Sequence, residues 1–238
     1  RIINRYLPNK IDSYNEKYLK IKIKYMIKNT LPDQIYTNYK TWKNTAFKKN
    51  KEIYTRLARK GQKPHTMIIS CCDSRINPSM MFGDEVGSFF IHRNIGNIIP
   101  PYENTVHDCG TSAAIEFGVC GLKVKHIVIL GHSECGAVKN GFHLCKDKKT
   151  NLDFIFVNKW LKYITPAYNL LEQAKNNKIM IKKLEKFNII NSINNLLTFP
   201  FIKKAIDLKN LHIHGLWINI ETGELEILNR QESIFEKL

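Results

Sequence analysis

Two short motifs hold the side chains whose types and spacing could do chemistry. Cys71, Asp73 and Arg75 lie in the run Cys-Cys-Asp-Ser-Arg. His132 and Cys135 lie in the run Gly-His-Ser-Glu-Cys-Gly, whose two flanking glycines are expected to let the backbone turn tightly around them. Two thiolates and one imidazole form a Cys₂His set that suits a zinc ion. Three protein ligands leave the fourth position of a tetrahedral ion open, which is typical of a catalytic rather than a structural metal site.

Asp73 is the nearby candidate for a fourth ligand, because it lies two residues after Cys71. Arg75 is placed to compete for the same carboxylate through a bidentate pair. We therefore expect Asp73 to be a conditional ligand, which binds the metal in a closed state and leaves it when Arg75 holds the carboxylate.

Apolar segments around these motifs alternate between strand and helix patterns. Residues 66–69, 88–91 and 124–130 read as short buried strands, and residues 111–122 carry apolar side chains at helical spacing. Strand, helix and strand with short joints indicate a parallel sheet, in which reactive groups lie beyond the carboxyl ends of the strands. The two motifs follow the first and third of these strands.

The whole chain of 238 residues, 43% of them hydrophobic, is long enough to bury a substantial core. We expect residues 1–33 to form an N-terminal extension or arm and residues 34–238 to form one catalytic domain. The C-terminal third predicts helices over residues 152–174 and 180–197, a short helix after Pro200, and a β-hairpin. The fold class is therefore α/β, with a central, mainly parallel sheet flanked by helices.

The formal net charge of +16 raises the question of nucleic-acid binding. The lysines are spread through asparagine-rich segments and arginine is scarce, so a solvated basic surface is expected and no nucleic-acid partner. The longest apolar runs are far shorter than the roughly 20 residues of a membrane span. The first ten residues lack the apolar core of a secretory signal, which predicts a cytoplasmic location, or an organelle if a targeting segment has been removed.

The two motifs together resemble those of the β-class carbonic anhydrases found in bacteria and plant plastids. The resemblance covers roughly residues 31–230. It includes the segments Gly61–Pro64, Phe90–Asn97, Pro100–Tyr102, Gly110–Phe117, Leu197–Phe201 and His214–Gly215.

The resemblance implies reversible hydration of carbon dioxide to bicarbonate and a proton, through attack of hydroxide on a zinc ion. One zinc ion per chain would be held by Cys71, His132 and Cys135, beside a catalytic pair formed by Asp73 and Arg75. The resemblance further implies that substrate is bound by Gln62, Phe90, Ile95 and Phe117. The chain would form a homodimer, or a tetramer of paired dimers, with the substrate pocket partly across the dimer interface.

The sequence departs from the family pattern at Cys72, where a small residue is usual, and in the loop Glu103–Cys109. In one branch of the family a Trp, an Arg and a Tyr hold an inhibitory bicarbonate ion. Here the matching residues are Ile68, Arg93 and Ile218, so we expect no such pocket and a structural role for Arg93.

Other functions are left open by the residues themselves. A zinc protein of the same fold could have lost its activity or act on a related heterocumulene. A thiol redox protein would need a Cys-x-x-Cys motif at a helix start, which is absent. A zinc-stabilised nucleic-acid binder would use a closed site with short loops, whereas Cys71 and His132 are 132 − 71 = 61 residues apart.

Overall fold

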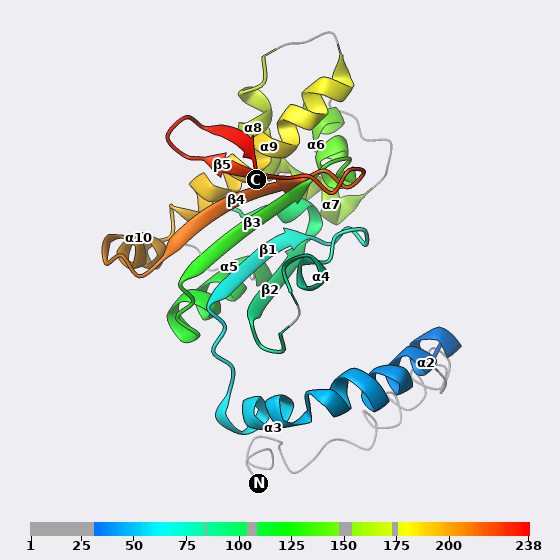
Figure 1. Cartoon of the computed structure of the whole chain (residues 1–238). Helices are drawn as coiled ribbons and strands as arrows, with labels where there is room; N and C mark the ends of the chain where they lie inside the picture. Colours follow the sequence, from blue (N-terminus) through cyan, green and yellow to red (C-terminus); the bar gives the residue numbers. More distant parts are fainter. Residues whose placement is uncertain (1–30, 84, 104–108, 148–153, 173–175) are drawn as a thin grey trace, which may run out of the picture. The chain divides into compact units, whose positions relative to one another are not determined.

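The structure, a computed structural model, describes residues 31–83, 85–103, 109–147, 154–172 and 176–238 (Figure 1). It divides into two compact units, Arg1–Tyr54 and Thr55–Leu238, each of which is described by itself. The expected N-terminal extension lies almost entirely outside the described residues, as does most of the loop Glu103–Cys109. The expected division at residues 33 and 34 stays a prediction.

The first unit contains helix α2 (Asp33–Trp42) and the π-helical turn η2 (Lys43–Phe47), and it ends within helix α3 (Lys51–Lys60). Neither α2 nor η2 buries a side chain. Rings of Trp42, Phe47 and Tyr54 pack against one another with centroids 5.0–5.9 Å apart. No prediction from the sequence covers these helices, although Ile35, Tyr39 and Trp42 in α2 follow a helical spacing and are exposed.

The second unit is built on one six-stranded sheet in the order β2-β1-β3-β4-β5-β6. The first four strands in this order are parallel, and β5 and β6 are added antiparallel. The strands are β1 (Thr66–Cys71), β2 (Phe89–Asn94), β3 (His126–His132), β4 (His212–Ile218), β5 (Leu225–Asn229) and β6 (Ile234–Lys237). The three predicted strands, the parallel sheet and the C-terminal hairpin are therefore confirmed, and β6 is an addition.

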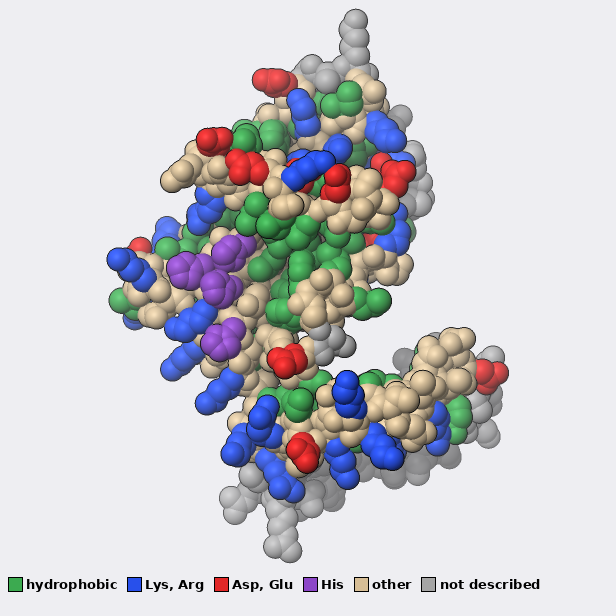
Figure 2. All heavy atoms as spheres, viewed as in Figure 1, with side chains coloured by type: hydrophobic (Ala, Val, Ile, Leu, Met, Phe, Trp, Pro, Cys, Tyr) green, Lys and Arg blue, Asp and Glu red, His purple; other side chains and the backbone are tan. Residues whose placement is uncertain are grey.

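Helices cover the two faces of the sheet unequally. The predicted helix over residues 111–122 forms α5 (Gly110–Glu116) and the π-helical turn η4 (Phe117–Gly121). It packs on one face together with α9 (Asn177–Leu196) and α10 (Pro200–Asp207) over a core of buried isoleucines. The other face carries the short helix α4 (Pro78–Phe82) and half-buried apolar side chains such as Val128. Figure 2 shows hydrophobic side chains gathered on the surface of the second unit.

The region predicted as one helix over residues 152–174 is broken into shorter pieces. These are α7 (Ile155–Leu161), the 3-10 turn η5 (Lys162–Ile164) and α8 (Thr165–Asn169). Pro166 lies in the first turn of α8, where no backbone N–H is needed, whereas inside a longer helix it would remove a hydrogen bond. The prediction of one continuous helix is therefore wrong, and its ends lie outside the described residues. No helix in the described part of the chain is long and apolar enough to cross a membrane.

Helix α9 approaches the sheet closely over a glycine that directly precedes His132. A Cβ atom on Gly131 would lie 2.7 Å from Cδ1 and 2.9 Å from Cγ1 of Ile189. Gly215, on the neighbouring strand β4, faces the same helix, and its Cβ would lie 3.0 Å from Cγ2 of Ile189. The absence of side chains at these two positions therefore sets the distance between α9 and the strands β3 and β4.

We expect Gly131→Ala to lower the free energy of unfolding by about 1–3 kcal/mol, because the added methyl group overpacks the contact with Ile189. Chemical denaturation of the purified protein measures this loss. Gly136→Ala is the matched control, because a Cβ on Gly136 meets nothing within 4 Å. Equal stability of the two variants would show that α9 is free to move away from the strand.

Candidate metal centre and active site

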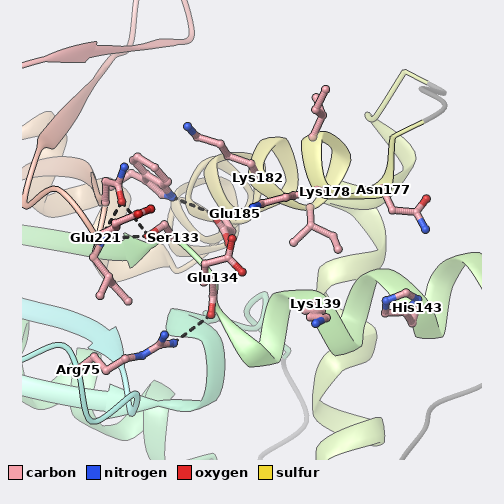
Figure 3. Close-up of a pocket in the computed structure, with 15 residues that line it drawn as sticks. Arg75, Ser133, Glu134, Lys139, His143, Asn177, Lys178, Lys182, Glu185 and Glu221 are labelled. Carbon is pink, nitrogen blue, oxygen red and sulfur yellow. Dashed lines mark hydrogen bonds between the residues drawn. The ribbon is translucent and has the colours of Figure 1, made fainter.

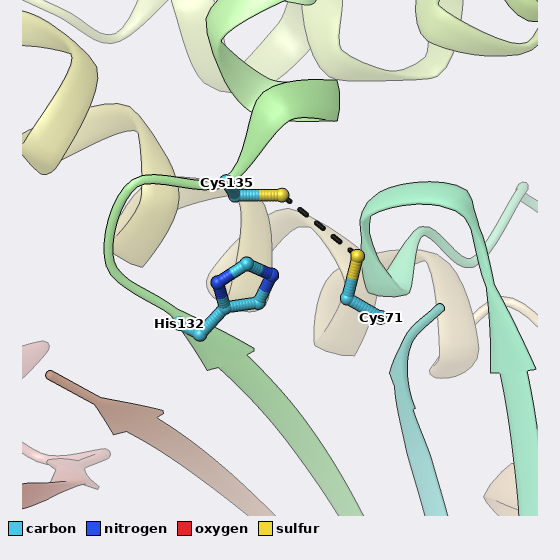
Figure 4. A group of neighbouring side chains, drawn as sticks. All are labelled: Cys71, His132 and Cys135. Atoms are coloured by element: carbon cyan, nitrogen blue, oxygen red, sulfur yellow. Dashed lines mark hydrogen bonds between the residues drawn. The ribbon is translucent and has the colours of Figure 1, made fainter. Parts of the chain in front are cut away.

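The two sequence motifs meet at the carboxyl edge of the sheet. Cys71 is the last residue of β1, His132 is the last residue of β3, and Cys135 directly precedes helix α6 (Gly136–Asp147). The Sγ atoms of the two cysteines and a ring nitrogen of His132 lie within 4.8 Å of one another (Figure 4). All three residues are buried. Among the described residues, no other three His, Cys, Asp or Glu side chains bring their ligand atoms this close together.

The turn between His132 and Cys135 is tight, but its glycines are not the reason. Glu134 adopts a left-handed conformation with a φ of 54°, whereas neither Gly131 nor Gly136 has a positive φ. The turn is also held by Ser133, whose N–H donates to the Ile218 carbonyl. The idea that flanking glycines allow the turn is therefore wrong for this chain, and Gly131 instead makes room for α9.

A hydrogen bond joins the thiols of Cys71 and Cys135. Their sulfur atoms are 3.9 Å apart, which matches the roughly 3.8 Å between two thiolates on one tetrahedral zinc ion with 2.3 Å bonds. The hydrogen bond from Cys135 lowers the pKa of Cys71, and the N–H of Gly96, 3.4 Å from Sγ of Cys71, acts in the same direction. The same contact raises the pKa of Cys135. One proton therefore leaves the pair easily, and a bound cation would favour loss of the second.

The imidazole of His132 is oriented for ligation. Its Nδ1 lies 2.8 Å from the carbonyl oxygen of Ser133, to which it donates. This fixes the proton on Nδ1 and leaves the lone pair on Nε2. Nε2 is buried and has no hydrogen-bond partner. A buried, unpaired nitrogen beside two thiols fits a zinc ion, because the ion would supply the missing partner.

Asp73 and Arg75 form the bidentate pair expected from their spacing. Arg75 Nε and Nη2 lie 2.9 and 2.7 Å from the two carboxylate oxygens, and Nη2 also donates to the Glu134 carbonyl at 3.1 Å. The hydrogen bonds from Arg75 hold the pKa of Asp73 well below its usual range. Oδ2 of Asp73 lies 3.9 Å from Nε2 of His132. The carboxylate is therefore ionised, held by Arg75, and adjacent to the ligand group.

The turn that carries Asp73 is held in place by Arg93. Its guanidinium donates to the carbonyl oxygens of Cys71, Asp73 and Ile76 at 2.8–3.0 Å. The predicted structural role of Arg93 is therefore confirmed. Ile68, at the position of the inhibitory branch's Trp, is buried in an apolar cluster on the sheet. The absence of an inhibitory bicarbonate pocket stays a prediction.

Sequence reasoning missed a buried carboxylate behind Cys135. Glu185, on α9, is 3% exposed, and its two oxygens accept from the backbone N–H of Cys135 and the indole of Trp217, each at 3.2 Å. Burial raises the pKa of Glu185 to about 7. No local motif marks this residue, because it comes from a helix 50 residues away in the sequence.

Glu185 also forms part of the wall of an open cavity of about 780 Å³ (Figure 3). Its lining includes Arg75, Glu134, Lys139 and Lys182, but none of the three ligand candidates. The cavity therefore lies beside the ligand group, because Arg75 holds Asp73 and Glu185 contacts Cys135. Its lining carries side chains of both charges.

The four predicted substrate-binding residues are not all near this group. Ile95 is close, because it precedes Gly96, which donates to Cys71, and its carbonyl accepts from Trp160. Phe90 and Phe117 pack together, with ring centroids 5.8 Å apart, but Phe90 is the second residue of β2, towards the amino edge of the sheet.

Gln62 is separated from the ligand group of its own chain by the length of a strand. It is exposed in the loop before β1, and Cys71 is the last residue of that strand. A strand of six residues spans about 17–20 Å. The structure therefore does not bring Gln62 to the Cys71 of the same chain.

A mainly parallel α/β sheet with two thiols and an imidazole at its carboxyl edge has its candidate metal site where α/β proteins commonly bind ligands. The carbonic anhydrase family matches residues 66–225, and the chain belongs to this family, in its β class. A carbonic anhydrase of Helicobacter pylori is 33% identical over 195 residues, which are 79% of this chain and 86% of the relative.

Solved structures agree with this assignment. The β-carbonic anhydrase CcaA superposes with a TM-score of 0.75 at 29% identity, over 86% of this chain and 91% of its own. A structure of two tetrameric β-carbonic anhydrases from the filamentous ascomycete Sordaria macrospora gives a TM-score of 0.71 at 29% identity, over 82% and 95% of the chains.

We expect Glu185→Gln to weaken zinc binding by about 10- to 100-fold, as is typical for residues that orient a metal ligand. A glutamine side chain has one acceptor oxygen, so it can accept from only one of the two donors, the Cys135 N–H and the Trp217 indole. Its NH₂ group would face the other donor, and two donors repel each other. Competition with a chelator measures the zinc affinity. Glu221→Gln is the matched control, because Glu221 lines the same cavity but is exposed. Equal loss in both variants would contradict an effect through Cys135.

The stability of the same variant should depend on pH in a defined direction. The folded protein keeps the Glu185 proton between pH 4.5 and about 7, whereas the unfolded chain loses it. The stability of the wild type relative to Glu185→Gln therefore decreases as pH rises through this range. Unfolding of both zinc-free proteins measures the difference, and a constant difference would contradict the raised pKa.

Proposed function

We propose that this chain catalyses the reversible hydration of carbon dioxide to bicarbonate and a proton, with one zinc ion held by Cys71, His132 and Cys135. The convergence of two thiols and an unpaired imidazole nitrogen, in a chain of the carbonic anhydrase family, carries the proposal. A zinc ion at this site would act as a Lewis acid that lowers the pKa of bound water, and so supply a nucleophile near neutral pH.

In this proposal Asp73 orients the nucleophile. The pKa of Asp73 lies well below the neutral range, so its carboxylate accepts a hydrogen bond but does not store a proton. Arg75 keeps the carboxylate in one orientation through two parallel hydrogen bonds. The pair therefore holds the attacking oxygen in position and leaves the fourth ligand position open.

Carbon dioxide is uncharged and apolar, so its pocket has to be apolar on the side away from the metal. Ile95 is 41% exposed and Phe117 is 53% exposed, although both are large apolar side chains. We propose that a second copy of the chain covers them, and that Phe90, Phe117 and Gln62 of one subunit complete the pocket beside Ile95 of the other. Gln62 would then donate a hydrogen bond to a substrate oxygen.

The unit proposed for catalysis is therefore a homodimer. A pocket made by two subunits needs their association, and exposed apolar side chains favour a large interface. The relatives from Sordaria macrospora are tetrameric, which supports pairing of two such dimers as a further step.

The zinc ion and the activity should be lost together when a ligand is removed. We expect one zinc ion per wild-type chain and fast hydration of carbon dioxide, and neither in Cys135→Ser. Stopped-flow hydration assays and metal analysis on the same samples test this. Cys120→Ser is the control, because that thiol is exposed and outside the ligand group. Stoichiometric zinc in Cys135→Ser would refute the ligand assignment, and a zinc-loaded but inactive wild type would refute the hydratase function.

A pocket shared between subunits predicts complementation. Gln62→Ala and Cys71→Ser should each be nearly inactive alone, because every site lacks one component. Refolded equal mixtures should recover about a quarter of the wild-type activity, since half of randomly paired dimers carry one complete site. A mixture of Cys71→Ser and Cys135→Ser is the control, because in it every site lacks a ligand. No recovery in the first mixture would place Gln62 outside the partner's pocket.

Removal of Arg75 should release Asp73 towards the metal. In Arg75→Ala we expect the carboxylate to become the fourth ligand, with activity lost most at low pH and partly regained as pH rises and hydroxide competes. Cobalt(II)-substituted protein reports the change in coordination by its visible spectrum. Arg75→Ala/Asp73→Asn should show the open spectrum of the wild type, and an open spectrum in Arg75→Ala itself would argue against the closed state.

A further inference from the structure

A second group of imidazoles lies at the amino ends of the parallel strands, opposite the carboxyl ends that carry the thiols. His126 is the first residue of β3, and His212 and His214 lie on β4. In the register of the two strands His126 is opposite His212, and Val128 is opposite His214. Because side chains alternate between faces, the three histidines share one face of the sheet. Figure 2 shows histidine side chains gathered on the surface of the molecule.

The spacing of two of these rings is that of two ligands on one metal ion. Nδ1 of His126 and Nε2 of His214 lie 3.1 Å apart. Metal–nitrogen bonds of 2.0–2.1 Å in a tetrahedral site place two nitrogens about 3.3 Å apart. An ion could therefore replace the single proton between the rings with almost no movement of either strand.

His212 is positioned to add a third ligand. Its ring stacks on that of His126, with centroids 5.4 Å apart and planes 25° apart. Its nitrogens do not converge with the other two within 4.8 Å, so the ring has to turn. His212 is exposed, and rotation of an exposed side chain costs little. Water would complete the coordination.

Burial and the neighbouring charges favour a neutral ring at His214. His214 is half-buried, and desolvation together with His126, His212 and Arg230 lowers its pKa, which leaves its nitrogens free of a second proton at neutral pH. Nearby Lys125 donates to Asn210. These positive charges weaken attraction for a cation, so an ion that bonds strongly to imidazole is favoured over calcium or magnesium.

We infer that His126 and His214, with His212, form a second metal site, which takes a divalent transition ion such as nickel, copper or zinc. Imidazole ligands without a carboxylate or thiolate select ions of this kind. The site is separate from the Cys71 group, because His126 and His132 are at opposite ends of β3, about 20 Å apart. A bound ion would link the amino ends of β3 and β4 and stabilise the folded chain.

The test uses the zinc-loaded full chain, titrated with nickel(II) by calorimetry, with zinc content measured before and after. We expect one nickel ion per chain without loss of zinc, and a rise in melting temperature with nickel concentration. His126→Gln and His214→Gln should each weaken binding by about tenfold or more, because a single imidazole of the pair remains. His212→Gln should weaken it less.

His143→Gln is the matched control, because His143 is a partly exposed histidine on α6 that pairs with Asp147 instead. Its nickel affinity should equal that of the wild type. Without added nickel, the three histidine variants should keep the carbon dioxide hydration activity and the melting temperature of the wild type. This comparison separates loss of the metal site from misfolding. Unchanged nickel affinity in both His126→Gln and His214→Gln would overturn the inference, as would release of zinc in proportion to the nickel bound.

Discussion

The arrangement of this site depends on the close contact between the two buried thiols of Cys71 and Cys135. Two sulfur atoms 3.9 Å apart in the core can carry only one negative charge comfortably, because low solvent exposure strengthens their repulsion. The Gly96 N–H offsets part of that charge, whereas the lone pair on Nε2 of His132 adds a third electron-pair donor beside the two sulfur atoms. Arg75 adds a positive charge at the rim. A bound cation would satisfy both sulfur atoms and the nitrogen of His132 together.

Helix α9 ties the separate parts of this arrangement together. Glu185 accepts from the Cys135 N–H, Asn188 donates to the Gly96 carbonyl at 2.8 Å, and Ile189 seats over Gly131. These contacts come from two successive turns of one helix, and each reaches a different loop or strand of the site. The positions of the ligands therefore depend on how closely a single helix packs on the sheet, and not only on the strands that carry them.

The sequence predicted the ligand group because its members follow strand ends, where chain direction alone brings them together. The same reasoning could not find Glu185, because its carboxylate reaches Cys135 through tertiary packing and no local pattern marks it. It also gave Gly131 the wrong role, since the need for a small residue came from a helix distant in sequence. Gln62 shows a further limit, because a residue can match a motif and still lie a strand's length from its own chain's site.

The last strand has a consequence for how copies of this chain can meet. β6 is four residues long, forms one edge of the sheet, and carries Glu236 and Lys237. Lys237 is engaged with Glu224 across the hairpin at 2.6 Å, and Asn229 donates to Glu236. A short, charged edge offers a poor template for a further strand. On the β6 side of the sheet, this edge therefore disfavours open-ended, fibre-like continuation of the sheet into a neighbouring molecule.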